Sequence, residues 1–176
     1  MSAEIPSNNP EKKEKLDDNA RKFLTGTLDP EFLEVNGASS FTLTVDWLEI
    51  GEDNETKIAH KKFDNSDIQI LLITKTTLDG HRTSEKEKIT EEKYRELLAL
   101  SILHLEKKRY EFEYNQNDIL FSVKYDEFTN SKLNMLEVDA TNEVERSSFN
   151  SDSFPIELVE VTGDMQYYGY RVADLI

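Results

Sequence analysis

Charged residues recur at every second position in several strand-like segments of this chain. The recurring positions are Arg82, Lys86 and Lys88, then Lys107 and Arg109, Lys124 and Asp126, and Glu137 and Asp139. Because successive side chains of a strand point to opposite faces of a sheet, each set shares one face. Such a face is either exposed to solvent, as most runs of charge are, or it lines a polar tunnel that binds a charged ligand. The periodicity alone leaves both interpretations open.

The segments that carry these charges are predicted strands of one antiparallel sheet. Residues 41–50 alternate apolar and polar side chains, which is the period of a half-buried strand. Further strands are predicted at residues 55–63, 67–77, 81–89, 106–114, 118–128, 132–141 and 155–162. Turn signals such as Asp79-Gly80 and Asn130-Ser131 separate several of them. Many consecutive strands predict an α+β fold built on an antiparallel barrel, since closure removes the sheet edges.

Two helices and one domain complete the predicted organisation. Thr90 is expected to cap a helix whose first turn is acidic, and Asp29-Pro30 predicts a short helix over residues 30–35. Residues 163–176 are weakly amphipathic and suit a further helix. Residues 1–16 hold two prolines and no apolar periodicity, so we expect a flexible tail. The rest, residues 17–176, is expected to form one domain.

Composition and charge exclude several classes of protein. The chain has no cysteine, which excludes disulfides and cysteine-based zinc sites or nucleophiles. It has no apolar run of about 18–20 residues, so no transmembrane helix is expected. Its first residues lack the apolar segment of a signal peptide, which favours a cytoplasmic location. With 21 basic and 36 acidic residues the net charge is −15, so no nucleic acid is expected as a partner. Nothing here indicates the oligomeric state.

A series of short motifs resembles, in order, those of the CYTH domains, also called triphosphate tunnel metalloenzymes. The family motifs are E-x-E-R-K-F, E-T-R-I-R, T-x-K, a glycine turn into R-x-E-x-E, K-T-R-Y, E-V-E and E-V-T. The matching segments are residues 18–24 (DNARKFL), 55–59 (ETKIA), 73–75 with 80–82 (ITK, GHR), 89–92 at the strand-to-helix junction (ITEE), 107–110 (KKRY), 136–139 (LEVD) and 160–162 (EVT). No single motif is specific, but seven in family order, from about residue 17 to the C-terminus, indicate this fold.

The resemblance implies an eight-stranded antiparallel barrel with accessory helices, whose tunnel holds a triphosphate-bearing or polyphosphate molecule. Lysine and arginine would neutralise phosphate oxygens, while carboxylates would hold Mg²⁺ or Mn²⁺ for metal-dependent hydrolysis. The basic positions that match the motifs are Lys22, Lys57, Lys75, Arg82, Lys107 and Arg109. The acidic positions, and hence the implied metal ligands, are Asp18, Asp126, Glu137, Asp139 and Glu160.

The chain departs from the family pattern mainly on the metal side, so its metal-site motifs are degenerate. Family glutamates are replaced by Ala20, Ser84, Lys86 and Lys124. Each lysine removes an oxygen ligand and adds a positive charge beside the ion. At about 5 Å and an effective dielectric constant of about 20, each unit-charge pair costs about 3 kcal/mol, and a divalent ion doubles that cost. A hydrolase that uses two metal ions is therefore disfavoured. One metal ion held by Asp126, Glu137 and Asp139 is still compatible with the sequence.

Three functions are consistent with these residues. The first is polyphosphate binding without the standard catalysis. The second is a non-catalytic structural or interaction protein that retains only the barrel, with its cations and carboxylates paired as a salt-bridge lattice. The third is a phosphohydrolase with altered metal geometry. The histidines lack metal-ligand spacing, and Tyr167, Tyr168 and Tyr170 are expected to plug a barrel end or pack on the sheet rather than bind a base.

Overall fold

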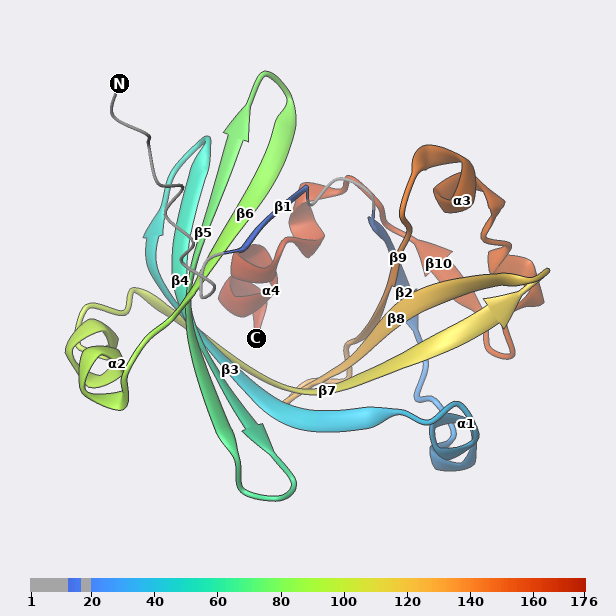
Figure 1. Ribbon diagram of the computed structural model, residues 1–176, viewed down its shortest axis with the longest axis horizontal. Helices are drawn as coiled ribbons and strands as arrows, with labels where there is room; N and C mark the ends of the chain where they lie inside the picture. The colour runs from blue at the N-terminus through green and yellow to red at the C-terminus, as the bar shows by residue number, and fades with distance from the viewer. Residues whose placement is uncertain (1–12, 17–19) are drawn as a thin grey trace, which may run out of the picture.

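The computed structural model describes residues 13–16 and 20–176, whose strands form one antiparallel sheet (Figure 1). The ten strands of this described part lie in the order β1-β6-β5-β4-β3-β7-β8-β9-β2-β10. The strands are β1 (Lys13–Leu16), β2 (Ala20–Thr25), β3 (Ser39–Ile50), β4 (Asn54–Phe63), β5 (Ile68–Leu78), β6 (His81–Lys88), β7 (Leu103–Gln116), β8 (Ile119–Phe128), β9 (Asn134–Asp139) and β10 (Leu158–Glu160). The helices are α1 (Pro30–Val35), α2 (Glu91–Leu98), α3 (Glu143–Ser148) and α4 (Gly169–Leu175), with 3₁₀ turns η1 (Ser151–Ser153) and η2 (Met165–Tyr167).

Tight turns join neighbouring strands where the sequence predicts them. Asp79 and Gly80, between β5 and β6, have φ values of 51° and 77°. Asn117 and Asp118, between β7 and β8, have φ values of 52° and 64°. Two successive residues with positive φ are typical of a type I′ turn, whose twist matches that of the flanking strands. These turns fix the pairing register, and the register decides which side chains share a face.

The two predicted helices begin at their predicted caps. The Asp29 carboxylate accepts a hydrogen bond from the Glu31 amide at 2.9 Å, and α1 starts at Pro30. The Thr90 hydroxyl accepts from the Lys93 amide at 3.1 Å at the start of α2. Each cap satisfies one of the amides that a helix N-terminus leaves without a partner. The amphipathic C-terminal segment contains α4, while α3 was not predicted. No helix within the described ranges is long and apolar enough to cross a membrane.

The sheet is curved, and each of its faces carries an apolar core. We call the face that contacts α4 the inner face and the opposite one the outer face (Figure 1). The inner core packs Val172 and Ala173 of α4 with Trp47 of β3. The outer core packs Leu33 of α1 and Phe149, which follows α3, with Tyr125 of β8. Because α4 covers part of the inner face, charged side chains there such as Lys57 and Asp126 are largely buried.

The predicted closure of eight strands into a barrel is wrong. At the two ends of the described sheet, β1 pairs with β6 and β10 pairs with β2, and the two ends do not pair with each other. The C-terminal helix α4 lies inside the curve of the sheet, between its ends (Figure 1). Val172 of α4 is 1% exposed and packs in the inner core. The sheet is therefore open.

The predicted boundary between tail and domain falls in a partly described region. Residues 1–12 and 17–19 lie outside the described residues. Residues 13–16, part of the predicted tail, form β1 and pair antiparallel with β6. From residue 20 onward, all described strands belong to the same sheet.

Candidate functional site

Strand register gathers the charged side chains of interest on the inner face. Lys75 pairs with Glu55 of β4 and with Ser84 of β6. Arg109 pairs with Asp126 of β8 and with Phe41 of β3. Directly paired residues of antiparallel strands share a face, and Phe41 belongs to the inner core. The charges therefore lie on the face that α4 covers.

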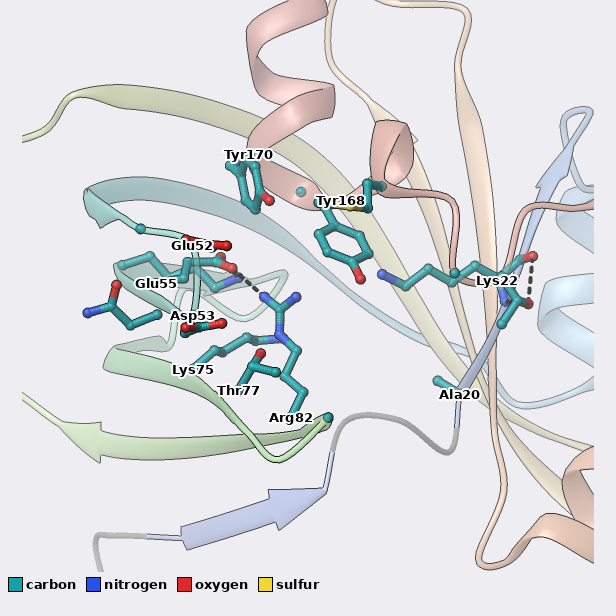
Figure 2. A pocket seen from close by; sticks show the side chains of 18 of the residues that line it. Ala20, Lys22, Glu52, Asp53, Glu55, Lys75, Thr77, Arg82, Tyr168 and Tyr170 are labelled. Atoms are coloured by element: carbon teal, nitrogen blue, oxygen red, sulfur yellow. Dashed lines mark hydrogen bonds and ion pairs between the residues drawn. The ribbon is translucent and has the colours of Figure 1, made fainter.

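Four of the six predicted phosphate-binding residues line one cavity of about 440 Å³. They are Lys22 of β2, Lys57 of β4, Lys75 of β5 and Arg82 of β6. Figure 2 shows Lys75 and Arg82 on one side of the cavity and Lys22 on the other. Arg146 of α3 is a fifth basic lining residue. The lining carboxylates are Glu52, Asp53, Glu55 and Glu137. Basic residues are thus the majority of the charges here, although acidic residues outnumber them 36 to 21 in the whole chain.

Glu55 organises the wall made by β4 and β6. Its side chain is buried, and its Oε1 atom accepts hydrogen bonds from Trp47 Nε1 at 2.7 Å and from Lys57 Nζ at 2.8 Å. Its Oε2 atom accepts from Arg82 Nη2. Burial raises the pKa of this carboxyl, but the charges of Lys57 and Lys75 outweigh burial and lower the pKa of Glu55 to about 2. Glu55 is therefore ionised at neutral pH and fixes two cations of the cavity.

Lys57 is a largely buried base of the cavity. Its side chain is 14% exposed, and its ammonium lies 5.4 Å from the centre of the Trp47 ring. Burial, together with the positive charge of Lys75, lowers the pKa of Lys57 to about 7, even though Glu55 acts in the opposite direction. The charge of this wall therefore depends on pH near neutrality.

Tyr168, between η2 and α4, separates the two sides of the cavity. Its ring centre lies 5.0 Å from Cζ of Arg82 and 5.5 Å from Nζ of Lys22. Figure 2 shows both cations approaching this ring from opposite sides. Within the described residues, the Lys22 ammonium has no carboxylate at ion-pair distance. A ring contact leaves the N–H donors of Lys22 available to an anion, whereas Arg82 also donates to Glu55.

Lys107 and Arg109, the other two predicted phosphate-binding residues, do not line this cavity. They form a separate buried cluster with Asp126, which is 6% exposed. Asp126 Oδ2 lies 2.6 Å from Lys107 Nζ and 2.7 Å from Arg109 Nη2, and its Oδ1 lies 2.7 Å from Arg109 Nε. Burial raises the pKa of Asp126, but the two cations outweigh it and the net shift is strongly downward. Both of its oxygens are thus committed to the chain's own cations.

Lys124 neutralises part of the remaining inner-face acid. Its ammonium lies 3.1 Å from Asp139 Oδ2. Glu137 pairs in register with both Lys124 and Lys22. Burial raises the pKa of Glu137, but the charges of these two lysines outweigh burial and lower the pKa to about 2. A position where the family has glutamate therefore holds a lysine that acts as counter-charge to two carboxylates.

The five predicted metal ligands are not brought together. Asp18 lies outside the described residues. Glu160 pairs in register with Phe23 of the outer core, and its carboxylate binds Arg21 through two contacts of 2.8 Å. Asp126 is held by its own cations, as described above. In the described part of the chain no group of three or more histidine, aspartate or glutamate side chains is placed to hold a metal ion. The donor set therefore does not fit Mg²⁺ or Mn²⁺ in this arrangement.

Three residues at the cavity were not predicted as site residues. Glu55 lies two positions before Lys57 in a motif of the resemblance, and this i,i+2 spacing was a usable signal for a shared face. Tyr168 was noticed only as part of an aromatic cluster. Arg146 belongs to no motif, and α3, which carries it, was not predicted.

The fold is similar to that of two solved structures. The crystal structure of the inorganic triphosphatase NE1496 matches with a TM-score of 0.59 and 19% identity, covering 92% of this chain and 94% of that one. A structure described as the hypothetical protein NE1496 gives the same TM-score and identity, covering 92% and 97%. No protein-family model matches the chain, and no curated protein matches it. At this level of identity the likeness shows the fold alone, which here is one antiparallel sheet with accessory helices.

Proposed function

We propose that this chain binds a polyphosphate or a triphosphate-bearing small molecule in the cavity between Lys22 and Arg82. The observation that carries the proposal is the convergence of basic side chains from four strands, and from α3, on one cavity of an acidic protein. Lysine offers a compact charge and arginine a planar fork of donors, and both suit phosphate oxygens. NE1496, which shares the fold, is described as an inorganic triphosphatase.

The size of the cavity suits such a ligand. At about 30 Å³ per water molecule, 440 Å³ holds roughly 15 waters. That is enough for the thirteen non-hydrogen atoms of tripolyphosphate, whereas a single orthophosphate would leave most of the space to water. A cation 4 Å from a phosphate oxygen contributes about 4 kcal/mol of attraction at an effective dielectric constant of about 20. Several such contacts favour an anion with many charges over one with few.

The binding we propose depends little on a metal ion. In metal-dependent phosphate chemistry the cation neutralises phosphate charge and bridges oxygens. Here Lys57, Arg82 and Lys22 supply positive charge, while the carboxylates of Glu55 and Asp139 contact the chain's own cations. Mg²⁺ would have to compete with lysine and arginine for those carboxylates. The proposal therefore concerns ligand binding and includes no catalytic step.

A second candidate is the non-catalytic scaffold, with the charges serving only stability. The cluster of Lys107, Arg109 and Asp126 favours it, because all its charges satisfy one another. The cavity differs from that cluster at Lys22, whose ammonium contacts the Tyr168 ring. The two candidates therefore make opposite predictions for added polyphosphate.

Calorimetric titration and thermal unfolding with inorganic tripolyphosphate test the proposal. A ligand that binds only the folded state at 100 times its Kd stabilises it by about 2.7 kcal/mol. For a chain of this length that corresponds to a rise in Tm of about 5–10 °C. Chelation with EDTA should leave the affinity within about threefold. An affinity that disappears on chelation would show that a metal site forms after all.

Charge-matched variants distinguish binding in the cavity from an effect of the protein's net charge. Arg82→Ala and Lys75→Ala should weaken tripolyphosphate at least about tenfold, because each removes charge-assisted hydrogen bonds. Arg95→Ala and Lys93→Ala change the net charge equally on exposed positions of α2, and they should have little effect. If wild type shows no binding or stabilisation at millimolar tripolyphosphate, the scaffold candidate is favoured and this proposal is wrong.

A further inference from the structure

The cations of the cavity stand on two walls that come from opposite ends of the open sheet. Lys57, Lys75 and Arg82 belong to β4, β5 and β6, near the end of the sheet formed by β1. Lys22 belongs to β2, next to the other edge strand, β10. Figure 2 shows Arg82 and Lys22 facing each other across Tyr168, with Lys75 on the Arg82 side. An anion bound to one wall alone would leave the cations of the other wall without a phosphate partner.

Arg146 of α3 also lines the cavity. Hydrogen bonds from Arg21 of β2, the strand that carries Lys22, hold the backbone of Arg146 in place. Arg21 Nη1 donates hydrogen bonds to the carbonyl oxygens of Arg146 at 3.1 Å and Phe149 at 2.7 Å. The same guanidinium binds the carboxylate of Glu160 through two further hydrogen bonds. The C-terminal turn of α3 is therefore tied to both β2 and β10. Arg146 is thus placed at the cavity by interactions that do not use its own side chain.

The Arg146 guanidinium has an N–H donor without an acceptor in the described part of the chain. It has five N–H groups. Its Nη1 atom makes a long contact of 3.3 Å with Oε1 of Glu143, whose side chain is 71% exposed. Its Nε atom is buried and has no hydrogen-bond acceptor in the described part of the chain. By contrast, the guanidinium groups of Arg21 and Arg109 each bind a carboxylate through two nitrogens. A buried donor without an acceptor is costly, and a phosphate oxygen would satisfy it.

We propose that Arg146 is a ligand-binding residue that contacts the distal phosphate of a chain whose other end is held by Lys75 and Arg82. This inference rests on the proposed function and adds selection by length to it. A ligand with phosphate groups at both ends reaches both walls, whereas orthophosphate reaches one. Arg146 therefore contributes to binding of tripolyphosphate and not to binding of orthophosphate.

The test measures the affinities of three inorganic probes, orthophosphate, pyrophosphate and tripolyphosphate, by calorimetric titration in EDTA. Arg146→Ala should weaken tripolyphosphate by about tenfold or more and leave orthophosphate within about twofold. Arg82→Ala should weaken all three probes. Arg95→Ala, at an exposed position of α2, is the charge-matched control and should change none of them. If Arg146→Ala weakens all three probes equally, or none of them, the inference is wrong.

Glu143→Gln separates ligand binding from a structural role of Arg146. This variant removes the ion pair with Arg146 and keeps the guanidinium. If Arg146 binds the ligand, tripolyphosphate affinity should be unchanged or higher in Glu143→Gln. A loss as large as that of Arg146→Ala would show that the ion pair matters only for holding α3, and it would overturn the inference. A wild-type protein that binds none of the probes would instead remove the proposed function itself.

Discussion

Asp126→Asn is expected to destabilise the protein by about 3 kcal/mol at neutral pH. The wild-type carboxylate is 6% exposed and lies within 2.7 Å of nitrogens of both Lys107 and Arg109. Removing one partner of a buried ion pair typically costs about 3–5 kcal/mol, because the remaining charges are buried without compensation. Asparagine keeps one acceptor oxygen, which places the expected loss at the lower end of that range. For a chain of this length, the loss corresponds to a fall in Tm of about 6–12 °C.

The pH dependence of this loss identifies its cause. The two cations hold the pKa of Asp126 well below its usual value, although burial acts in the opposite direction. An unfolded aspartate binds its proton near pH 3.9, so below that pH the unfolded state binds more protons than the folded state. The carboxylate's contribution is therefore complete above about pH 4 and decreases as the pH falls further. The stability difference between wild type and Asp126→Asn should be constant from pH 5 to 7 and should shrink below pH 4.

Urea unfolding of both proteins across this pH range measures the difference. Asp64→Asn is the matched control, because Asp64 makes an exposed ion pair with Lys108 and should matter far less. A loss below about 1 kcal/mol in Asp126→Asn, or one that does not depend on acid pH, would refute the view that this carboxylate is the buried counter-charge of the cluster.

Two further predictions concern Lys57, which lines the cavity, and Ser84 of β6. The pKa of Lys57 is lowered to about 7 in the folded state, against 10.5 unfolded, so the unfolded state binds more protons between these values and stability should rise with pH from 7 to 10. In urea unfolding, Lys57→Met should not show that rise of stability with pH. Between pH 6.5 and 8.5 the tripolyphosphate affinity of Lys57→Met should fall less than that of wild type. If wild type and variant change equally with pH, the lowered pKa does not belong to Lys57. Ser84 is 2% exposed, and its hydroxyl has no hydrogen-bond partner among the described residues. Ser84→Ala should therefore be neutral or up to about 1 kcal/mol more stable by urea unfolding, and a clear loss of stability would show that the hydroxyl has a partner.

The sequence alone determined most of the local structure and the faces on which the charges lie. The turn at Asp79-Gly80 and the cap at Asp29 were predictable because they depend on the chemistry of a few adjacent residues. The shared face of Lys107 and Arg109 followed from the two-residue period of a strand. These are short-range properties, and they require no knowledge of what packs against the strand.

The tertiary structure decided which of those charges meet and what they contact. Alternation could not show that Lys107 and Arg109 would be neutralised by Asp126, because that contact depends on the register of β7 with β8. Glu160 was expected at a metal site, yet its register with Phe23 places it on the outer face, opposite the cavity.

The pattern of strands in the sequence also could not predict that the sheet stays open. A series of antiparallel strands is compatible with closure, and whether it closes depends on what occupies the space between the first and last strands. Here α4 occupies it, with Val172 buried in the inner core. Arg146 lines the cavity, and Arg21 hydrogen-bonds to its backbone carbonyl across 125 residues of chain. Such placement is set by long-range packing and hydrogen bonding, which no local pattern of residues encodes.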